Sequence, residues 1–337
     1  MNRREHVFDP GSGERSVTEA LTPPNGSPVV VAIDIGGSWI KGALVGADAR
    51  PTAGERVATP DASEAELVEA VAALTLGLAD LAQRRGTPAV AVGISTAGVI
   101  DETSGTARRS ANLRWRNTAL ARHLEERTGR RVTLLQDARA AAQAEAVLGA
   151  GRDADNFLMV ILGTGVGGAV VSGGRPLLGS HGLAGEIGHL QLDPEGPLCG
   201  CGGRGCLEMV ASGTALSRRY NDATGRLLPA EAVLELVIEG DPVATGLWSD
   251  AVSALAVALA AAVAVLDIEL VIFGGGMAAA GQLLLDPLAN ELAARVVLAP
   301  PPRLTVAALG NDAGLLGAAA AALRSVGHDG LVRSWQS

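Results

Sequence analysis

The chain contains 337 residues, of which 48% are hydrophobic and 19% are charged, and its formal net charge is −9. A chain of this length and apolar content can bury a full core, which excludes a disordered protein and suggests one large or two medium domains. The acidic balance argues against sequence-independent nucleic-acid binding, because such binding needs a basic face. We therefore expect a globular protein whose partners are small molecules.

Residues 1–27 are predicted to form a disordered tail, because they are polar and lack the apolar segment of a targeting signal. Only residues 251–273 resemble a membrane span in their apolar content. Asp267 and Glu269 interrupt this stretch and its first part is rich in alanine, so it is interpreted as a buried helix that runs into a strand. We expect a soluble, cytoplasmic protein.

Strands and helices are predicted to alternate along the chain. Runs of β-branched and other apolar residues predict strands at 29–33, 40–45, 89–94, 132–135, 157–162, 169–172, 270–273 and 304–307. Helices are predicted at 63–85, 118–128, 138–148, 211–220, 230–239, 242–266, 282–297 and 313–326. Ser63 and Glu66 have the spacing of a capping box at the start of the first helix.

One unit occurs twice in this order: a strand, a glycine turn and a return strand. The two copies lie about 130 residues apart, and each short turn predicts a hairpin. This repetition predicts two related lobes of an α/β protein with a cleft between them.

The glycine turn of the second copy, residues 163–168, matches the dinucleotide fingerprint G-x-G-x-x-G. The fingerprint needs a helix after the turn, whereas residues 169–172 continue as a strand, which argues against a Rossmann site. Amides in such a turn can still bind a phosphate, although an ordinary hairpin is the alternative. A Walker A loop is impossible, because Lys41 is the only lysine and Gly42 follows it.

The first glycine turn begins at Asp34, whose carboxylate is a hard oxygen ligand suited to a phosphate-bound Mg²⁺. Lys41 is close enough in sequence to neutralise phosphate charge, although a solvated strand lysine would show the same pattern. A third glycine run, residues 274–276, would let an adenine or ribose approach the backbone closely.

The three cysteines, Cys199, Cys201 and Cys206, lie in one glycine-rich loop. Together with His189 they form a tetrahedral zinc set with no open position, so the metal would be structural. His181 is the other candidate for the fourth ligand, and three unrelated buried thiols are the alternative to a metal site. Three clustered cysteines are too few for a disulfide framework, which favours an intracellular protein.

Three carboxylates are candidates for chemistry. Asp137 follows Gln136 at the end of a predicted strand, where α/β proteins place their reactive groups, and it could act as a general base on a hydroxyl. The alternative is that Asp137 only caps the following helix. Glu186 and Glu208 flank the cysteine loop, so a metal that fixes the loop would also aim them.

Together these motifs resemble the ROK family of sugar kinases, named for repressors, open reading frames and kinases. The resemblance rests on the DIGG run at Asp34, the LGTG run at Leu162, the GEIGH run at Gly185 and the cysteine loop, and it covers roughly residues 29–326. It implies the two RNase-H-like lobes of the actin–hexokinase–heat-shock ATPase fold. The expected lobes are residues 28–137, rejoined by 312–326, and 138–311, which carries the zinc loop at 185–208.

The resemblance implies an ATP:hexose 6-phosphotransferase in which Asp137 takes the proton from the sugar 6-hydroxyl. The implied sugar contacts are Asn112, Gln136, Glu186, His189 and Glu208. The implied ATP contacts are Asp34, Gly36, Gly37, Ser38, Lys41, Gly163, Thr164, Gly165, Gly167, Gly275 and Gly276. The implied zinc ligands are His189, Cys199, Cys201 and Cys206. ATP, Mg²⁺, a structural Zn²⁺ and a homo-oligomer, dimer or tetramer, are expected.

One position departs from the family, which carries Asn-Asp where this chain has Gln136 and Asp137. A longer amide near the sugar 3-hydroxyl suggests a hexose that differs from glucose there, such as the aminosugar kanosamine (3-amino-3-deoxy-D-glucose) of antibiotic biosynthesis. An ordinary glucokinase and a sugar-sensing regulator are the alternatives. About 28 residues precede the first strand and contain no paired amphipathic helices, which argues against a DNA-binding repressor.

Overall fold

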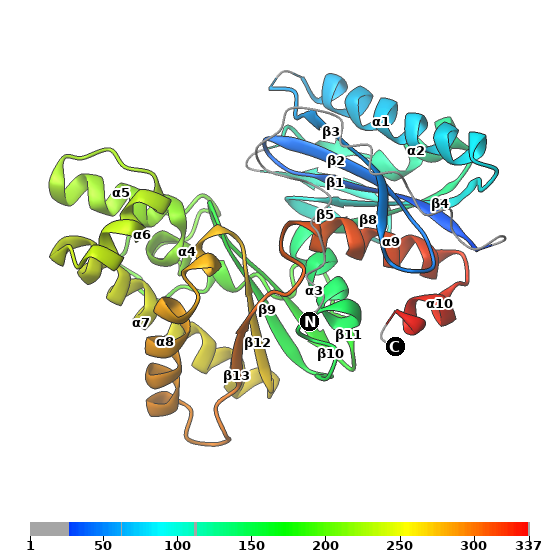
Figure 1. The fold of residues 1–337 in the computed structure, drawn as a ribbon. Helices are drawn as coiled ribbons and strands as arrows, with labels where there is room; N and C mark the ends of the chain where they lie inside the picture. Colours follow the sequence, from blue (N-terminus) through cyan, green and yellow to red (C-terminus); the bar gives the residue numbers. More distant parts are fainter. Residues whose placement is uncertain (1–26, 62, 111–112, 336–337) are drawn as a thin grey trace. The chain divides into compact units, whose positions relative to one another are not determined.

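The computed structural model describes residues 27–61, 63–110 and 113–335, so almost all of the predicted tail lies outside it. The described chain forms two compact units. Unit 1 contains the residues up to Arg152, the short segment Leu178–Leu183 and the residues from Asn311 onward. Unit 2 contains Asp153–Leu177 and Ala184–Gly310. Each unit is built on its own five-stranded sheet (Figure 1).

In unit 1 the strand order is β3-β2-β1-β4-β8. The strands are β1 (Val29–Ile35), β2 (Trp39–Val45), β3 (Pro51–Ala58), β4 (Ala89–Thr96) and β8 (Arg131–Gln136). β1, β4 and β8 are parallel, while β1 to β3 form antiparallel hairpins. A three-stranded sheet is added by β5 (Val99–Asp101), β6 (Thr106–Arg109) and β7 (Arg116–Thr118). The helices are α1 (Glu64–Arg84), α2 (Leu120–Thr128), α3 (Asp137–Leu148), α9 (Ala313–Ser325) and α10 (Asp329–Ser334).

In unit 2 the strand order is β11-β10-β9-β12-β13, which repeats the pairing pattern of unit 1. The strands are β9 (Phe157–Leu162), β10 (Val166–Ser172), β11 (Arg175–Pro176), β12 (Leu270–Gly274) and β13 (Arg303–Val306). The helices are α4 (Glu208–Ala211), α5 (Gly213–Thr224), α6 (Ala230–Glu239), α7 (Pro242–Leu266) and α8 (Gln282–Arg295). Short 3-10 turns are η1 (Ile187–His189), η2 (Gly276–Ala280) and η3 (Gly310–Asp312), the last at the unit boundary. The duplicated strand–turn–strand unit predicted from the sequence is confirmed.

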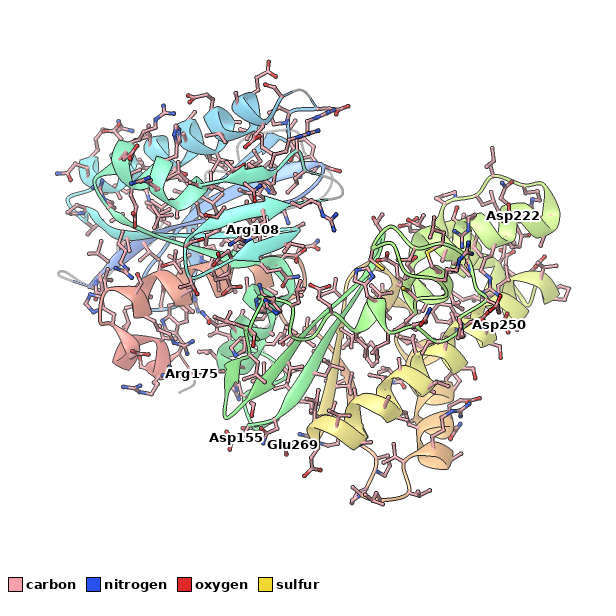
Figure 2. All side chains as sticks on the ribbon, turned by 180° about the vertical axis from the view of Figure 1, so that it is seen from behind. Arg108, Asp155, Arg175, Asp222, Asp250 and Glu269 are labelled. Atoms are coloured by element: carbon pink, nitrogen blue, oxygen red, sulfur yellow. The ribbon has the colours of Figure 1, made fainter. Side chains whose placement is uncertain are left out.

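In the second sheet Glu269, just before β12, connects the start of β12 with the start of β9. Its Oε1 accepts from the backbone N–H of Asp155 (3.2 Å), and its own N–H donates to the carbonyl of Asn156 (3.1 Å). Asp155 and Glu269 lie next to each other at the base of this sheet (Figure 2). These contacts start β9 and β12 side by side in parallel register, so both strands end at the same edge.

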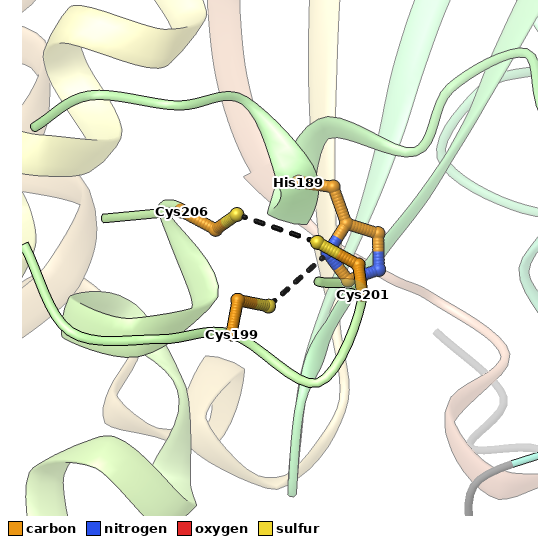
Figure 3. A group of neighbouring side chains, drawn as sticks. All are labelled: His189, Cys199, Cys201 and Cys206. Atoms are coloured by element: carbon orange, nitrogen blue, oxygen red, sulfur yellow. Dashed lines mark hydrogen bonds between the residues drawn. The ribbon is translucent and has the colours of Figure 1, made fainter. Parts of the chain in front are cut away.

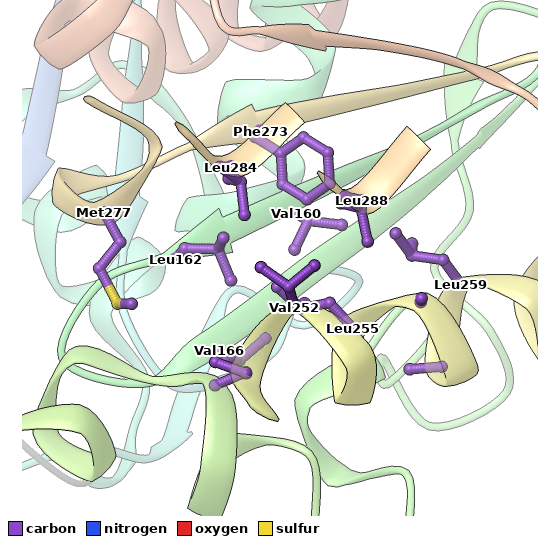
Figure 4. Packing of buried hydrophobic residues seen from close by; sticks show 14 of the residues in the cluster. Val160, Leu162, Val166, Val252, Leu255, Leu259, Phe273, Met277, Leu284 and Leu288 are labelled. Atoms are coloured by element: carbon purple, nitrogen blue, oxygen red, sulfur yellow. The ribbon is translucent and has the colours of Figure 1, made fainter. Parts of the chain in front are cut away.

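Helix α7 packs on the sheet of unit 2. Leu255 and Leu259 of this helix join Val160 of β9 and Phe273 of β12 in one buried cluster (Figure 4). Within the described residues, α7 is the one helix long and apolar enough to cross a membrane by length and composition. The interpretation of residues 251–273 as a helix that runs into a core strand is confirmed.

Helix α9 approaches its neighbours in unit 1 more closely than side chains would allow. A Cβ on Gly93 of β4 would lie 1.9 Å from the carbonyl oxygen of Ala318 in α9. A Cβ on Gly317 of α9 would lie 1.8 Å from the carbonyl oxygen of Ala140 in α3. The alanine-rich helix α9 is therefore held in backbone contact with the sheet on one side and with α3 on the other.

This packing also decides to which unit α3 belongs. The second lobe was expected to span residues 138–311, whereas unit 1 extends to Arg152 and also includes Leu178–Leu183. Gln143 of α3 donates its Nε2 to the carbonyl of Gly317 in α9 (3.0 Å), in addition to the close backbone approach. The fold thus keeps α3 with the strand that precedes it.

Replacing Gly317 by alanine should lower the free energy of unfolding by about 1–3 kcal/mol, because the added methyl group must push α9 away from α3. Urea denaturation followed by circular dichroism measures this change. The control is Gly77→Ala in the exposed face of α1, where a Cβ meets nothing within 4 Å. That change should stabilise the protein by about 0.5–1 kcal/mol. Equal stability of Gly317→Ala and the parent would contradict the close helix contact.

Candidate active site

The carboxyl ends of the parallel strands bring two predicted site residues to one edge of unit 1. Asp34 of β1 is paired with Ser95 of β4, and Ser95 is paired with Leu135 of β8. Asp137 follows two residues later, at the first position of α3. Because neighbouring strands are spaced by about 4.8 Å, Asp34 and the end of β8 lie roughly 10 Å apart along this edge.

Asp34 and Lys41 are direct cross-strand partners on β1 and β2. Desolvation raises the pKa of Asp34, whereas the Lys41 ammonium and the Ser95 hydroxyl lower it and the nearby Asp312 carboxylate raises it again. The Lys41 ammonium donates to the carbonyl of Asn311 (3.3 Å). Lys41 is therefore tied to the site edge rather than being a freely solvated strand residue, and the first charge it neutralises is that of Asp34.

The turn after β1 is stabilised by Thr59, which was not predicted as a site residue. Thr59 donates its hydroxyl to the carbonyl of Gly36 (2.7 Å) and its N–H to the carbonyl of Ser38 (3.0 Å). Gly37 and Ser38 are exposed. A turn whose carbonyls are bound to the protein and whose tip is exposed can present amides to an anion.

The cap of α3 is Gln136 and not Asp137. The Gln136 Oε1 accepts the backbone N–H of Arg139 (2.9 Å), which is the side-chain bond of an N-cap. The Asp137 carboxylate accepts the N–H of Ala138 (2.8 Å) at the start of the helix. The alternative role predicted for Asp137, a plain helix cap, is therefore taken by its neighbour. Asn112, the other predicted sugar contact of this lobe, lies outside the described residues.

In unit 2 the two predicted nucleotide turns follow neighbouring parallel strands. Ile161 of β9 is paired with Gly274 of β12, so the Gly163–Gly165 turn and Gly275 leave the same edge. Gly275 has φ +86°, and a Cβ there would lie 2.4 Å from the carbonyl oxygen of Leu162, so this glycine is required by the fold. At Gly163 and Gly276 a Cβ would meet nothing within 4 Å. These two glycines leave open space against the backbone, as close approach of a ligand requires.

Glu208 connects this turn with the cysteine loop. Its Oε2 accepts the N–H of Val166 (3.0 Å), directly after Thr164 and Gly165. Its Oε1 lies 3.9 Å from the Sγ of Cys199. The residue predicted as a sugar ligand therefore also fixes the glycine turn, and Gly167 lies in β10.

The Cys₃His cluster assembles as predicted (Figure 3). The ligand atoms of His189, Cys199, Cys201 and Cys206 all lie within 4.8 Å of one another. The Cys201–Cys206 sulfur distance and the distance from Cys199 Sγ to His189 Nδ1 are both 3.7 Å. Two sulfurs that share a tetrahedral zinc at about 2.3 Å are roughly 3.8 Å apart, so the donor set and spacing fit this ion. The cluster contains His189 and not its rival His181.

The histidine of the cluster comes from a segment packed tightly on β10. A Cβ on Gly188 would lie 1.9 Å from the carbonyl oxygen of Val166, and the backbone N–H of His189 donates to the carbonyl of Glu186 (3.1 Å). Because Nδ1 faces the sulfurs, the Nε2 of this exposed imidazole lies on the other side of the ring. Glu186, half-buried, begins the same 3-10 turn.

The comparison with known proteins adds the family. The ROK family pattern matches residues 30–325, nearly the whole chain. The chain belongs to the ROK family. It is 34% identical over 316 residues to a glucokinase from Thermotoga maritima, which covers 88% of this chain and 98% of the relative. It is 39% identical over 296 residues to an N-acetylmannosamine kinase from Escherichia fergusonii, which covers 86% and 96%.

A solved structure of another ROK protein is similar to this chain over most of its length. The ROK family glucokinase from Streptomyces griseus, in complex with glucose and AMPPNP, is 32% identical to this chain. It superposes with a TM-score of 0.75 over 88% of this chain and 99% of that chain. The ROK protein described here is thus a sugar kinase, a phosphotransferase with the actin/hexokinase-like fold.

Two residues beside Asp137 were missed by the sequence analysis of this ROK kinase. Arg139 is buried in the first turn of α3, and its Nε donates to Glu102 Oε1 (2.5 Å). The available signal was an arginine within a helix otherwise made largely of alanine. Glu102 lies in the turn after β5 and carried no local signal, because only the tertiary fold brings it to α3.

Replacing His189 by alanine should reduce bound zinc from about one equivalent per chain to well below it, since a three-cysteine set lacks the fourth ligand. Metal analysis of purified protein by mass spectrometry measures the content, and the melting temperature should fall with it. His181→Ala is the matched control and should retain zinc. Zinc retained in His189→Ala, with loss in His181→Ala, would reverse the assignment.

Replacing Gly276 by alanine should leave the fold intact but raise the KM for ATP roughly tenfold or more, because the methyl group fills space against the backbone that the nucleotide needs. Steady-state kinetics at saturating sugar measures this. Gly246→Ala in α7, where a Cβ also meets nothing within 4 Å, is the control and should leave KM unchanged. An unaltered KM in Gly276→Ala would remove this glycine from the nucleotide site.

Proposed function

We propose that this kinase transfers the γ-phosphoryl group of ATP to the 6-hydroxyl of a glucose-configured hexose, with Asp137 as the general base. The observation that carries the proposal is the position of the Asp137 carboxylate. It follows the carboxyl end of β8, one of three parallel strands, where its Oδ1 accepts the N–H of Ala138 while Gln136 provides the N-cap of α3. A carboxylate there can accept the proton of a bound hydroxyl.

The remaining chemistry is positioning and charge neutralisation, as phosphoryl transfer requires. Each unit has a glycine turn with amides that can bind phosphate oxygens, at Gly37 and Ser38 in unit 1 and at Thr164 and Gly165 in unit 2. The amides of Gly36 and Gly163 close their own turns, on the carbonyls of Trp39 and Gly165. Asp34 would hold the Mg²⁺ of the nucleotide, which supplies charge neutralisation to the phosphates. Asp34 fits this task, because Asp312 nearby adds a second carboxylate.

The sugar contacts proposed for the other hydroxyls are Gln136, Glu186, His189 and Glu208, together with Asn112. In Glu208, one oxygen is bound to Val166 and each oxygen retains a second lone pair for a hydroxyl. For His189, Nδ1 would bind the zinc and Nε2 the sugar, and the metal would fix the ring orientation. The three cysteines are proposed as zinc ligands rather than disulfide partners, which supports a reducing compartment, the cytoplasm.

The hydrogen-bonding groups of Gln136 bear on the choice between two candidate sugars. The Gln136 Oε1 already accepts the N–H of Arg139, and the amide has two further donors on Nε2. Amide donors suit a hydroxyl oxygen, and we therefore propose glucose before an aminosugar. Kanosamine is the second candidate, since the second lone pair of Oε1 can accept from an ammonium group.

The test is a sugar panel of glucose, N-acetylmannosamine, glucosamine and kanosamine with coupled detection of ADP. Glucose should give the highest kcat/KM. Asp137→Asn should lower kcat by about 10³-fold or more while sugar binding, followed by calorimetry, stays within a few fold.

Three outcomes would change the proposal. Turnover by Asp137→Asn within tenfold of the parent would remove Asp137 as the base. A parent that binds sugar without producing ADP would favour the sugar-sensing regulator instead. Kanosamine ahead of glucose would replace glucose by the second candidate.

A further inference from the structure

A buried ion pair stands beside the proposed base. Arg139 has 1% of its side chain exposed and Glu102 has 13%, and their Nε and Oε1 atoms are 2.5 Å apart. Arg139 follows Asp137 by two residues, on the first turn of α3. The pair is therefore part of the same helix end that carries the Asp137 carboxylate.

The hydrogen bonds of this pair involve the residues that precede and follow Asp137 in the chain. The same Glu102 Oε1 accepts the backbone N–H of Gln136 (3.1 Å), the residue before Asp137. The backbone N–H of Arg139 donates to the Gln136 side chain (2.9 Å). The strand end and the helix start that flank Asp137 are thus joined through one carboxylate and one guanidinium.

Arg139 also holds a distant piece of chain in unit 1. Its Nη1 donates to the carbonyl of Gly182 (2.9 Å), within the segment Leu178–Leu183. Gly182 has φ +70°, and a Cβ there would lie 2.9 Å from the carbonyl oxygen of Ile100, so the segment packs closely on β5. In sequence this segment leads directly to Glu186.

Stability alone is a poor explanation for this arrangement. A buried ion pair loses hydration for both charges, and well-packed apolar residues of similar volume are often as stabilising. A planar guanidinium binds two separate acceptors at fixed angles, and an apolar side chain cannot. The pair can therefore fix the orientation of the groups around it.

We propose that Arg139, oriented by Glu102, is a positioning residue for the transfer reaction: it fixes the backbone on both sides of Asp137 and so the aim of its carboxylate. The inference rests on the proposed role of Asp137 as the base. It adds a pair of residues that act through Asp137 and that do not touch the substrate.

The variant Arg139→Met removes the donors while keeping an unbranched side chain. It should lower kcat by about 10- to 100-fold, the cost of a displaced reacting group, with the KM for ATP within about twofold of the parent. Glu102→Gln keeps the acceptor oxygen for both Gln136 and Arg139 and should lose much less kcat than Glu102→Ala.

The matched control is Gln143→Leu, also on α3 and buried, which removes the bond to Gly317. It should lower the melting temperature and leave kcat within about twofold, which separates positioning from stability. Should Arg139→Met fail to fold, the comparison of Glu102→Gln with Glu102→Ala carries the test.

A double-mutant cycle with Asp137→Asn separates this inference from the proposed function. If Arg139 acts through Asp137, Arg139→Met should cost little further kcat once Asp137 is replaced. An undiminished cost in that background, or a folded Arg139→Met with the kcat of the parent, would overturn the inference. High turnover by Asp137→Asn alone would instead show that the proposed function fails.

Discussion

The hydrogen-bond register of the parallel strands is the constraint on which both units depend. Parallel strands end at a common edge of the sheet, so residues that are distant in sequence come to lie along the same edge. In unit 1 this edge gathers Asp34 and Asp137, and in unit 2 it gathers the turns after β9 and β12. The same strand order in the two sheets means that one physical solution is used twice, with carboxylates at the first edge and glycines at the second.

In unit 2 a single side chain links the Cys₃His cluster to the glycine turn. Glu208 touches Cys199 at one oxygen and holds the amide of Val166 with the other. The GEIGH segment supplies His189 to the cluster and packs Gly188 against the same Val166. The segments that form the cluster also contact the glycine turn at Val166. We therefore expect the cluster to stabilise the conformation of the turn.

The sequence was most informative where the chemistry is local. The hairpins, the capping box at Ser63 and the Cys₃His set follow from spacing alone, and the structure confirms them. Boundaries shifted where neighbours in space decide, as for α3, whose attachment to unit 1 comes from the contact of Gln143 with Gly317.

Other features had no local pattern to find. The strands β3, β5, β6, β7 and β11 and the helices α4 and α10 are short or mixed in polarity and were missed. The ion pair between Glu102 and Arg139 joins residues that only the folded chain brings together. The role of Gln136 as cap depended on which of two adjacent polar side chains turns back to the helix, and backbone conformation decides that choice.

The single lysine gives the protein an unusual chemical property. Amine-directed reagents, and any acylating metabolite, find one side-chain amine in the entire chain, and it is the one paired with Asp34 beside the first glycine turn. The other 26 of the 27 lysine and arginine residues are arginines, which amine-directed reagents do not modify. Acylation at Lys41 would leave the Asp34 carboxylate without its neighbouring positive charge, so covalent damage to this protein would be concentrated at one edge of one sheet.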